Sequence, residues 1–294
     1  MKKMHYFNIT YMCDSNCKFC AANVGLIDQD GYTIHPEAFE KQLINENVQD
    51  GDIVMISGGE PSLSPYFWDI LDICKKYNSR VELTTNGHIF EDKVLAEKLY
   101  RYGYVNAQIS IFGVNEQHDY LTGCEGNYQR TMCALENFAS FKDNAQFSVT
   151  VKFLLSKATV EGNKDAYTSI YGRFGNKFNY SLNALLISDK VIKNRQELLE
   201  PYSETLKKLG NFVEMKNLRI DTIPLCLLSE KKRNDHLRMH HVDLLKVYSD
   251  AKVYEENMDN YNCLKCNLCR VEKYCDKFLP SYIEYFGEDE ISPI

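Results

Sequence analysis

The chain has 294 residues, of which 44% are hydrophobic and 26% charged, proportions typical of a globular protein with one large domain and a small one. Its 34 Lys and Arg against 41 Asp and Glu give a net charge of −7, which disfavours nucleic acid as a partner because a polyanion would be repelled. The apolar runs are only strand-sized and the opening MKKMHYFNIT lacks the apolar core of a signal peptide, so we expect a cytoplasmic protein with no membrane partner.

Short apolar runs alternate with amphipathic stretches as far as about residue 210, which is the pattern of repeated βα units around a parallel sheet. We predict strands at residues 5–10, 53–57, 81–85, 105–112, 147–155 and 179–187. Helices are predicted at residues 36–48, 65–77, 91–103, 128–141 and 161–174, with a last helix near 195–209.

Six such units predict an α/β fold, a partial (β/α)6 TIM-like barrel, with functional groups in the loops after the strand carboxyl ends. After residue 210 the alternation decays into short strands such as LRIDTI and a cysteine-rich tail. We therefore divide the chain into a barrel at residues 1–210 and a small C-terminal domain at residues 211–294.

The loop after the first strand holds three cysteines spaced C-x3-C-x2-C, namely Cys13, Cys17 and Cys20. Eleven cysteines without an export signal argue against a disulfide framework and for thiols that bind metal or lie buried. A structural zinc site needs four protein ligands, whereas a cubane iron–sulfur cluster held by three thiolates leaves one iron open to a substrate. The spacing favours such a cluster, with a zinc site completed by a distant His or Cys as the alternative.

The next three loops carry polar groups to the same edge of the predicted sheet. The second strand ends in SGGEP, where Gly58 and Gly59 let the backbone approach a small ligand and Glu60 adds an acceptor for an ammonium group. The third strand ends in ELTTNG and presents Asn86, and the fourth carries Ser110. Each of these features alone also fits an ordinary turn or strand cap.

In combination, these motifs resemble the radical S-adenosylmethionine (radical SAM) superfamily over roughly residues 5–190. The resemblance rests on the three cysteines, with Phe19 before the last of them, followed by GGEP after the second strand. It implies a [4Fe–4S] cluster whose fourth iron is chelated by the amino and carboxylate groups of S-adenosylmethionine. The missing protein ligand would then be the cosubstrate.

The same resemblance implies that the cluster splits S-adenosylmethionine into methionine and a 5′-deoxyadenosyl radical, which abstracts a hydrogen atom from a substrate. A low-potential donor such as a flavodoxin or ferredoxin would supply the electron. The residues implied to contact the cosubstrate are Phe19 near adenine, Gly58, Gly59, Glu60 and Pro61 at the methionine ammonium group, and Asn86 and Ser110 near the methionyl or ribose groups.

The stretch GVNEQHDYLTGCEGNYQRTM resembles radical SAM enzymes that modify peptides. By this resemblance His118 and Asp119 are expected to contact ribose or substrate, although both also fit a capped loop. Cys124, in the same loop, is a candidate hydrogen-atom donor or a thiol without a catalytic role.

The C-terminal cysteines resemble the shortened auxiliary-cluster domains of the SPASM/Twitch group. Cys266, Cys269 and Cys275 have the spacing C-x2-C-x5-C, and Cys226 is expected to join them in a second [4Fe–4S] cluster. Cys263 is a surplus thiol that could replace one of the four. A structural zinc site is the alternative, because the spacing does not distinguish the two metals.

The sequence therefore predicts a radical SAM enzyme that modifies a ribosomally synthesised peptide by cross-link formation, epimerisation or a related oxidation. An alternative substrate is a small molecule such as an aminocyclitol or a nucleoside. A remote alternative is a non-enzymatic interaction protein that binds zinc at both ends.

Overall fold

The computed structural model describes residues 3–26, 32–143, 145–239, 243–248, 265–269, 275 and 277–294. Within these residues, parallel strands form one sheet in the order β7-β6-β5-β4-β3-β2-β1-β8. The strands are β1 (Lys3–Thr10), β2 (Ile53–Gly58), β3 (Arg80–Thr85), β4 (Val105–Ser110), β5 (Phe147–Leu155), β6 (Asn179–Ala184), β7 (Leu218–Asp221) and β8 (Asp243–Tyr248).

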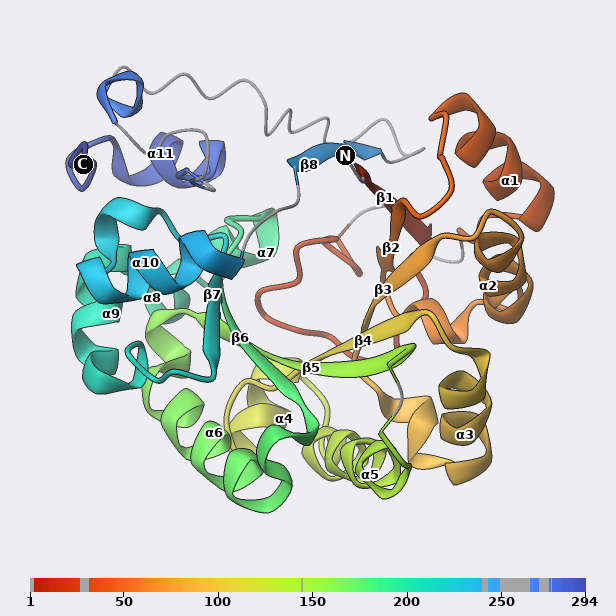
Figure 1. Cartoon of the computed structure of the whole chain (residues 1–294). Helices are drawn as coiled ribbons and strands as arrows, with labels where there is room; N and C mark the ends of the chain where they lie inside the picture. Colours follow the sequence, from red (N-terminus) through yellow and green to blue (C-terminus); the bar gives the residue numbers. More distant parts are fainter. Residues whose placement is uncertain are drawn as a thin grey trace.

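The sheet curves into a partial barrel with helices around its outside (Figure 1). The parallel pairing of successive strands requires a crossover after each strand, and helices provide these crossovers. The helices are α1 (Pro36–Asn45), α2 (Phe67–Lys76), α3 (Lys93–Tyr102), α4 (Glu116–Thr122), α5 (Asn127–Ser140), α6 (Val160–Phe174), α7 (Asp189–Lys193), α8 (Arg195–Leu198), α9 (Tyr202–Leu209), α10 (Glu230–Met239) and α11 (Pro280–Phe286).

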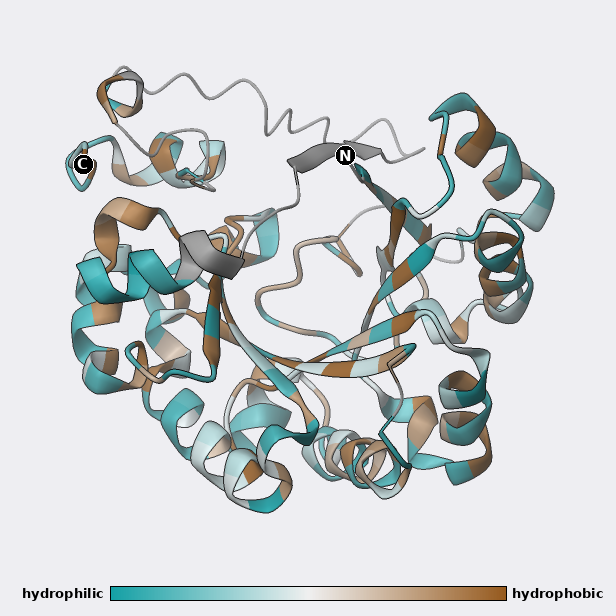
Figure 2. Ribbon diagram, viewed as in Figure 1, coloured by the Kyte–Doolittle hydropathy of each residue, from teal (hydrophilic) through white to brown (hydrophobic). Residues whose placement is uncertain are grey.

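The main hydrophobic core lies between the convex face of the sheet and the helices. Successive strand residues point to opposite faces, so alternate positions such as Val149, Val151 and Phe153 of β5 enter this core and are at most 3% exposed. The intervening positions carry polar side chains toward the concave face. Figure 2 shows the resulting alternation of hydrophobic and hydrophilic bands along several strands.

The predicted (β/α)6 barrel is confirmed as an α/β fold with a parallel, barrel-like sheet. The same sheet also includes β7 and β8, which lie beyond the predicted boundary near residue 210. The LRIDTI segment supplies β7 and pairs in parallel with β6. The division into two domains stays a prediction.

The observed elements differ locally from the predicted ones. The predicted helix at 195–209 is two helices, α8 and α9, separated at Pro201, which lacks a backbone N–H and disfavours helical geometry in the residue before it. The predicted strand 105–112 ends at Ser110 and the predicted strand 179–187 ends at Ala184. The short helix α4 was not predicted.

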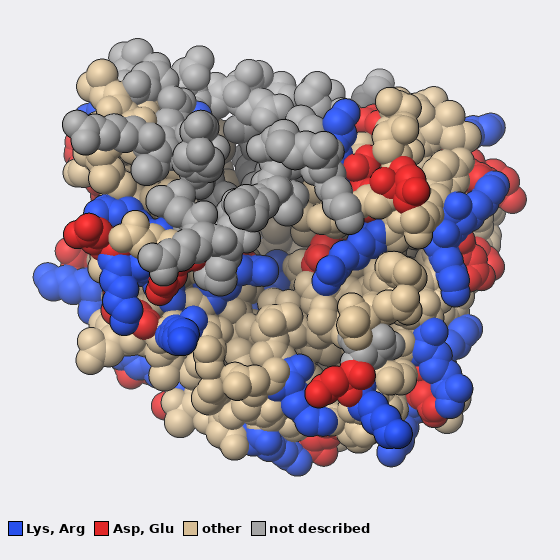
Figure 3. All heavy atoms as spheres, in the orientation of Figure 1, with Lys and Arg blue, Asp and Glu red and all other residues tan. Residues whose placement is uncertain are grey.

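Charges of both signs share the surface. On the face in Figure 3, Lys and Arg side chains are interspersed with Asp and Glu among the coloured residues. Among the residues that the structure describes, no helix is both long and apolar enough to cross a membrane.

Candidate active site

The three predicted cysteine ligands lie in one loop, residues 11–26, at the carboxyl end of β1 (the three-cysteine loop). Cys13, Cys17 and Cys20 are free thiols and partly exposed. Two backbone hydrogen bonds attach the loop to α4: Asn16 N–H donates to the Thr122 carbonyl (2.8 Å) and Lys18 N–H to the Leu121 carbonyl (3.0 Å). The unpredicted helix α4 therefore positions the loop.

The pKa values of Cys13 and Cys17 bear on whether the thiols of this loop fit a shared metal group. Burial raises the pKa of Cys17, and the neighbouring Cys20 and Cys13 raise it further. Burial likewise raises the pKa of Cys13 to about 12. Clustered thiols that oppose each other's ionisation become thiolates when a metal supplies the compensating positive charge. The donor set therefore fits an iron–sulfur cluster.

In the described part of the chain, no three His, Cys, Asp or Glu side chains converge as ligands of a single ion. A cubane cluster does not require such convergence, because each cysteine thiolate binds a different iron atom.

The loop Gly58–Glu60 (the GGE loop) lies directly against the three-cysteine loop. Gly59 N–H donates to the Thr10 carbonyl and Glu60 N–H to the Met12 carbonyl, both at 2.7 Å. A Cβ atom on Gly58, whose φ is +126°, would lie 2.2 Å from the Thr10 oxygen, and one on Gly59 would lie 2.3 Å from the Met12 oxygen. The glycines thus permit close approach of the chain itself; their predicted role toward a ligand stays a prediction.

Glu60 is 1% exposed, and its carboxylate is held at the end of β3. One oxygen accepts from Thr85 Oγ1 (2.7 Å) and Ser62 N–H (3.1 Å), and the other accepts from Asn86 N–H (2.7 Å). Burial raises the pKa of Glu60, and these hydrogen bonds act against that rise. Pro61 begins the short 3-10 helix that follows (Pro61–Leu63). The carboxylate is rigidly placed beside the three-cysteine loop.

Asp14, a residue that sequence reasoning missed, joins the same two regions. It accepts from Asn86 Nδ2 (2.7 Å), interacts with His88 Nδ1 (2.9 Å) and forms an ion pair with Arg130 (3.0 Å). Burial acts to raise the pKa of Asp14, but His88, Asn86 and Arg130 outweigh it and lower the pKa to about 2. The available sequence signal was an Asp directly after the first cysteine.

An aromatic stack connects the three-cysteine loop to α4. The ring centroid of Phe19 lies 4.3 Å from that of Phe112, which stacks on His118 at 5.6 Å with 14° between the planes. Phe112 N–H donates to His118 Nδ1 (3.2 Å), so that nitrogen carries no proton. Burial lowers the pKa of His118 to about 4. His118 is therefore neutral at physiological pH.

The other predicted residues in this region have the following places. The Asp119 carboxylate accepts from Gly126 N–H and Tyr128 N–H, both at 2.7 Å, and so caps the start of α5. Ser110 is the last residue of β4 and is partly exposed. Cys124 is exposed. Roles of these residues and of His118 toward cosubstrate or substrate stay predictions.

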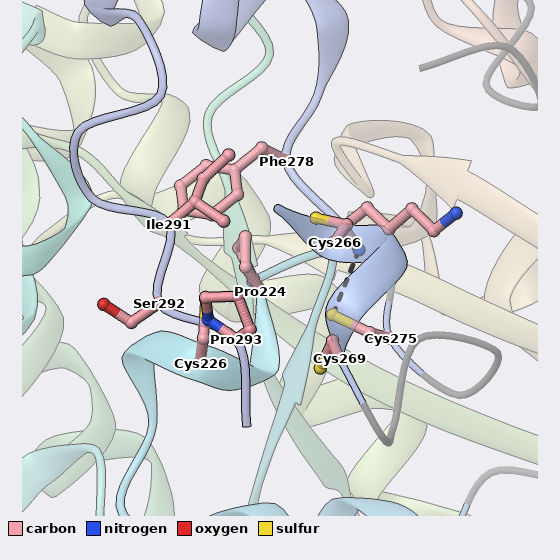
Figure 4. Close-up of a pocket in the computed structure, with 10 residues that line it drawn as sticks. Pro224, Cys226, Cys266, Cys269, Cys275, Phe278, Ile291, Ser292 and Pro293 are labelled. Atoms are coloured by element: carbon pink, nitrogen blue, oxygen red, sulfur yellow. Dashed lines mark hydrogen bonds between the residues drawn. The ribbon is translucent and has the colours of Figure 1, made fainter. Parts of the chain in front are cut away.

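Four of the five predicted C-terminal ligands line one small pocket (Figure 4). They are Cys226, in the 3-10 helix Leu225–Leu227, with Cys266, Cys269 and Cys275. Cys263 lies outside the described residues.

The surroundings of this pocket fit a cluster with four thiolate ligands. Cys275 Sγ accepts from the N–H groups of Leu225 and Lys277, both at 3.3 Å, and hydrogen bonds to sulfur are among the features that tune iron–sulfur clusters. Phe278, Ile291 and Pro293 line the pocket with apolar groups.

Comparison of the sequence with known proteins identifies its family. The model of the "Radical SAM superfamily" matches residues 7–153, half of the chain. The mycofactocin maturase MftC of Mycolicibacterium smegmatis is 29% identical over 177 residues, which cover 58% of this chain and 41% of that protein. The AdoMet-dependent heme synthase of Methanosarcina barkeri is 30% identical over 157 residues, covering 53% and 43%. The chain thus spans less than half the length of both relatives.

Among solved structures, Streptococcus suis SuiB bound to the precursor peptide SuiA superimposes with a TM-score of 0.55 at 17% identity. The match covers 75% of this chain and 48% of SuiB. At this identity the likeness supports the fold alone.

Proposed function

Because the chain belongs to the radical SAM superfamily, we propose that it abstracts a hydrogen atom from a ribosomally synthesised peptide and so modifies it. Family members use a [4Fe–4S] cluster with S-adenosylmethionine, and when bound here that pair supplies the 5′-deoxyadenosyl radical. Cys13, Cys17 and Cys20 would hold this cluster, and Cys226, Cys266, Cys269 and Cys275 an auxiliary one.

One observation carries the proposal: backbone hydrogen bonds join the three-cysteine loop to the GGE loop at the carboxyl edge of the sheet. The paired backbone bonds from Gly59 and Glu60 fix the spacing between the three thiols and the Glu60 carboxylate. In the proposed site, the carboxylate accepts from the ammonium group of S-adenosylmethionine, and Phe19 borders the adenine. Pre-organised groups of this kind orient a cosubstrate without rearrangement at the moment of reaction.

A peptide is the favoured substrate because of the names of one sequence relative and one solved structure with the same fold. One relative is a maturase, and SuiB is bound to a precursor peptide. The heme synthase relative favours a small molecule as the second candidate, which would include an aminocyclitol or a nucleoside. A flavodoxin- or ferredoxin-like electron donor and a cytoplasmic location complete the proposal. Membership of an enzyme superfamily speaks against the remote alternative, a non-enzymatic zinc-binding protein.

The test is an anaerobic incubation of the reconstituted protein with S-adenosylmethionine and a strong reductant. We expect 5′-deoxyadenosine and methionine, and stimulation by a peptide encoded near the gene, whose mass falls by two hydrogens or is unchanged. Formation of S-adenosylhomocysteine alone would overturn the radical reaction. Stimulation by a consumed sugar or nucleoside, with none by peptides, would select the second candidate.

The contribution of Glu60 is tested with Glu60→Gln, which keeps the shape but removes the charge. We expect weaker binding of S-adenosylmethionine with unchanged iron content. Glu161→Gln is the matched control, because Glu161 is exposed on α6 and the ion pair that it forms with Lys164 is 3.6 Å long. If both variants bound S-adenosylmethionine equally well, Glu60 would not be one of the residues that bind it.

A further inference from the structure

The concave face of the sheet carries polar side chains on neighbouring strands, although strands of parallel sheets are commonly apolar on both faces. The helices α1, α2, α3, α5, α6 and α9 lie on the other face (Figure 1). The polar positions are Glu82 and Thr84 of β3, Asn106 and Gln108 of β4, Thr150 and Lys152 of β5, Ser181 and Asn183 of β6, and Arg219 and Asp221 of β7.

Most charges on this face belong to ion pairs, but Lys152 does not. Arg80 lies 3.6 Å from Glu82, and Arg219 lies 2.8 Å from Asp221. Within the part of the chain that the structure describes, no carboxylate oxygen lies within 4.0 Å of Lys152 Nζ. Lys152 is therefore a cation on the concave face without a carboxylate partner of its own among these residues.

A chain of hydrogen bonds fixes the position of the Lys152 ammonium group. Its Nζ donates to Gln108 Oε1 (3.0 Å), and Gln108 Nε2 donates to Glu82 (2.7 Å). Asn106 also donates to Glu82 (2.6 Å), so Glu82 directs the amide oxygen of Gln108 toward Lys152. An ammonium group has three donors, and the described residues use one of them.

The register of the sheet places Lys152 close to the candidate active site. Lys152 pairs with Ser110, the last residue of β4, on one side and with Ser181 of β6 on the other. The Lys152 carbonyl accepts from Ile111 N–H (2.9 Å), just beyond β4. The side chain thus belongs to the carboxyl-terminal half of the concave face, the half nearer the three-cysteine loop. The residue as a whole is half-buried.

We propose that Lys152 binds a carboxylate group of the substrate on the concave face of the sheet. This inference rests on the proposed function, in which the substrate is a peptide, and the carboxylate is either an Asp or Glu side chain or the free C-terminus. Burial lowers the pKa of Lys152 more than the charges of Asp221 and Glu82 raise it, and a bound carboxylate would add to the effect of these two residues. Charge-assisted hydrogen bonds from the two N–H donors that the described residues leave unused give the site its preference for a carboxylate over an amide.

The probes are three N-acetylated peptides of five residues. The first is Gly-Gly-Glu-Gly-Gly with a C-terminal amide, and the second has Gln in place of Glu. The third consists of five glycines and has a free C-terminal carboxylate. Their binding to reconstituted protein with S-adenosylmethionine but no reductant is measured by saturation-transfer NMR. We expect at least one carboxylate probe to bind about tenfold more tightly than the Gln probe, which corresponds to about 1.4 kcal/mol. The probe that binds identifies the source of the carboxylate.

Three variants assign the preference to Lys152. Lys152→Met should abolish it, and Lys152→Arg should keep it because the positive charge remains. Lys207→Met, on the exposed side of α9, should leave it unchanged. The proposal is overturned if no carboxylate probe binds, if carboxylate and amide probes bind alike, or if the preference survives in Lys152→Met.

Because the measurement contains no reductant, it is independent of radical formation. A protein that prefers carboxylate probes yet never cleaves S-adenosylmethionine would refute the proposed function and leave the carboxylate site standing. Cleavage of S-adenosylmethionine without a carboxylate preference would refute the carboxylate site and leave the proposed radical reaction intact.

Discussion

The backbone N–H of Gly59 donates a hydrogen bond of 2.7 Å to the carbonyl of Thr10, the last residue of β1. This bond joins the loops that follow two neighbouring strands, so the first thiol, three residues after Thr10, has a fixed position relative to the GGE loop. Main-chain contact at this distance is possible because neither Gly58 nor Gly59 has a side chain.

Gly59→Ala tests this contact. The added Cβ would meet the Met12 carbonyl at 2.3 Å, so the two loops must separate, at a cost of about 1–3 kcal/mol in the free energy of unfolding. We expect a lower midpoint in urea and less iron bound by the three-cysteine loop. Gly172→Ala is the control: it lies within α6 with no atom within 4 Å of the new Cβ, so it should raise stability by up to about 1 kcal/mol. Equal effects of the two changes would contradict the role of the contact.

Metal content distinguishes the two cysteine sites. Fully loaded protein should contain about eight irons and eight sulfides per chain, since each cubane cluster holds four of each. Replacing Cys13, Cys17 and Cys20 together by Ala should remove about half of the iron, and replacing Cys266 and Cys269 should remove the other half. Cys133→Ala on α5 should change nothing. Zinc in either site, measured by elemental analysis, would refute the cluster assignment for that site.

Asp14→Asn should loosen the attachment of the three-cysteine loop to the end of β3. The change removes the negative charge beside Arg130 and places an amide N–H₂ against either the Asn86 donor or the donors of His88 and Arg130. We expect a loss of about 1–3 kcal/mol in the free energy of unfolding, measured with urea. Asp165→Asn, exposed on α6, provides the comparison and should stay within about 0.5 kcal/mol of the parent. A loss no larger than that of the comparison would mean that these bonds contribute little.

His118 makes the stability of the protein depend on pH. Its folded pKa is lowered by burial to about 4, against 6.5 for an unperturbed histidine. The unfolded chain therefore takes up a proton first, and the stability that the neutral buried ring contributes is present above pH 6.5 and lost as the pH falls toward 4. This pKa shift corresponds to on the order of 3 kcal/mol in the free energy of unfolding.

The measurement is urea unfolding between pH 7 and pH 4. His118→Gln should flatten the decline, because Gln still accepts from Phe112 N–H but does not titrate. His35→Gln, at the exposed start of α1, should leave the decline as it is. A parallel decline in the parent and in His118→Gln would show that other groups cause it.

Local patterns in the sequence predicted much of the fold and of the site. The alternation of apolar positions indicated the first six strands, and the motifs indicated the three-cysteine loop, the GGE loop, Asn86 and Ser110. These signals are local, because each depends on residues only a few positions apart. The density of cysteines near residue 270 also indicated a shared site for Cys266, Cys269 and Cys275, and the resemblance to the SPASM/Twitch group added Cys226; all four line one pocket.

Contacts between distant segments could not be predicted in this way. Asp14 meets His88 and Arg130, which are 74 and 116 positions away, because the loop after β1, the turn after β3 and the start of α5 lie at the same edge of the sheet. The surroundings of Lys152 are a second example. The alternation of side chains along β5 places Lys152 on the concave face, but its hydrogen bond to Gln108 and its pairing with Ser110 depend on the register of β5 against β4. The membership of β7 and β8 in the sheet likewise depends on long-range pairing.

The pairing of β8 with β1 has a consequence for synthesis of the chain. Among the strands that the structure describes, β1 is made before the others; β2 covers one of its edges about fifty residues later, and β8 (Asp243–Tyr248) covers the other. Until then a nascent chain exposes a row of unpaired N–H and C=O groups along β1, of the kind that templates pairing between molecules. Premature termination anywhere between β7 and β8 would make that exposure permanent, so such fragments should associate through β1 even though the strands from β1 to β7 are all present.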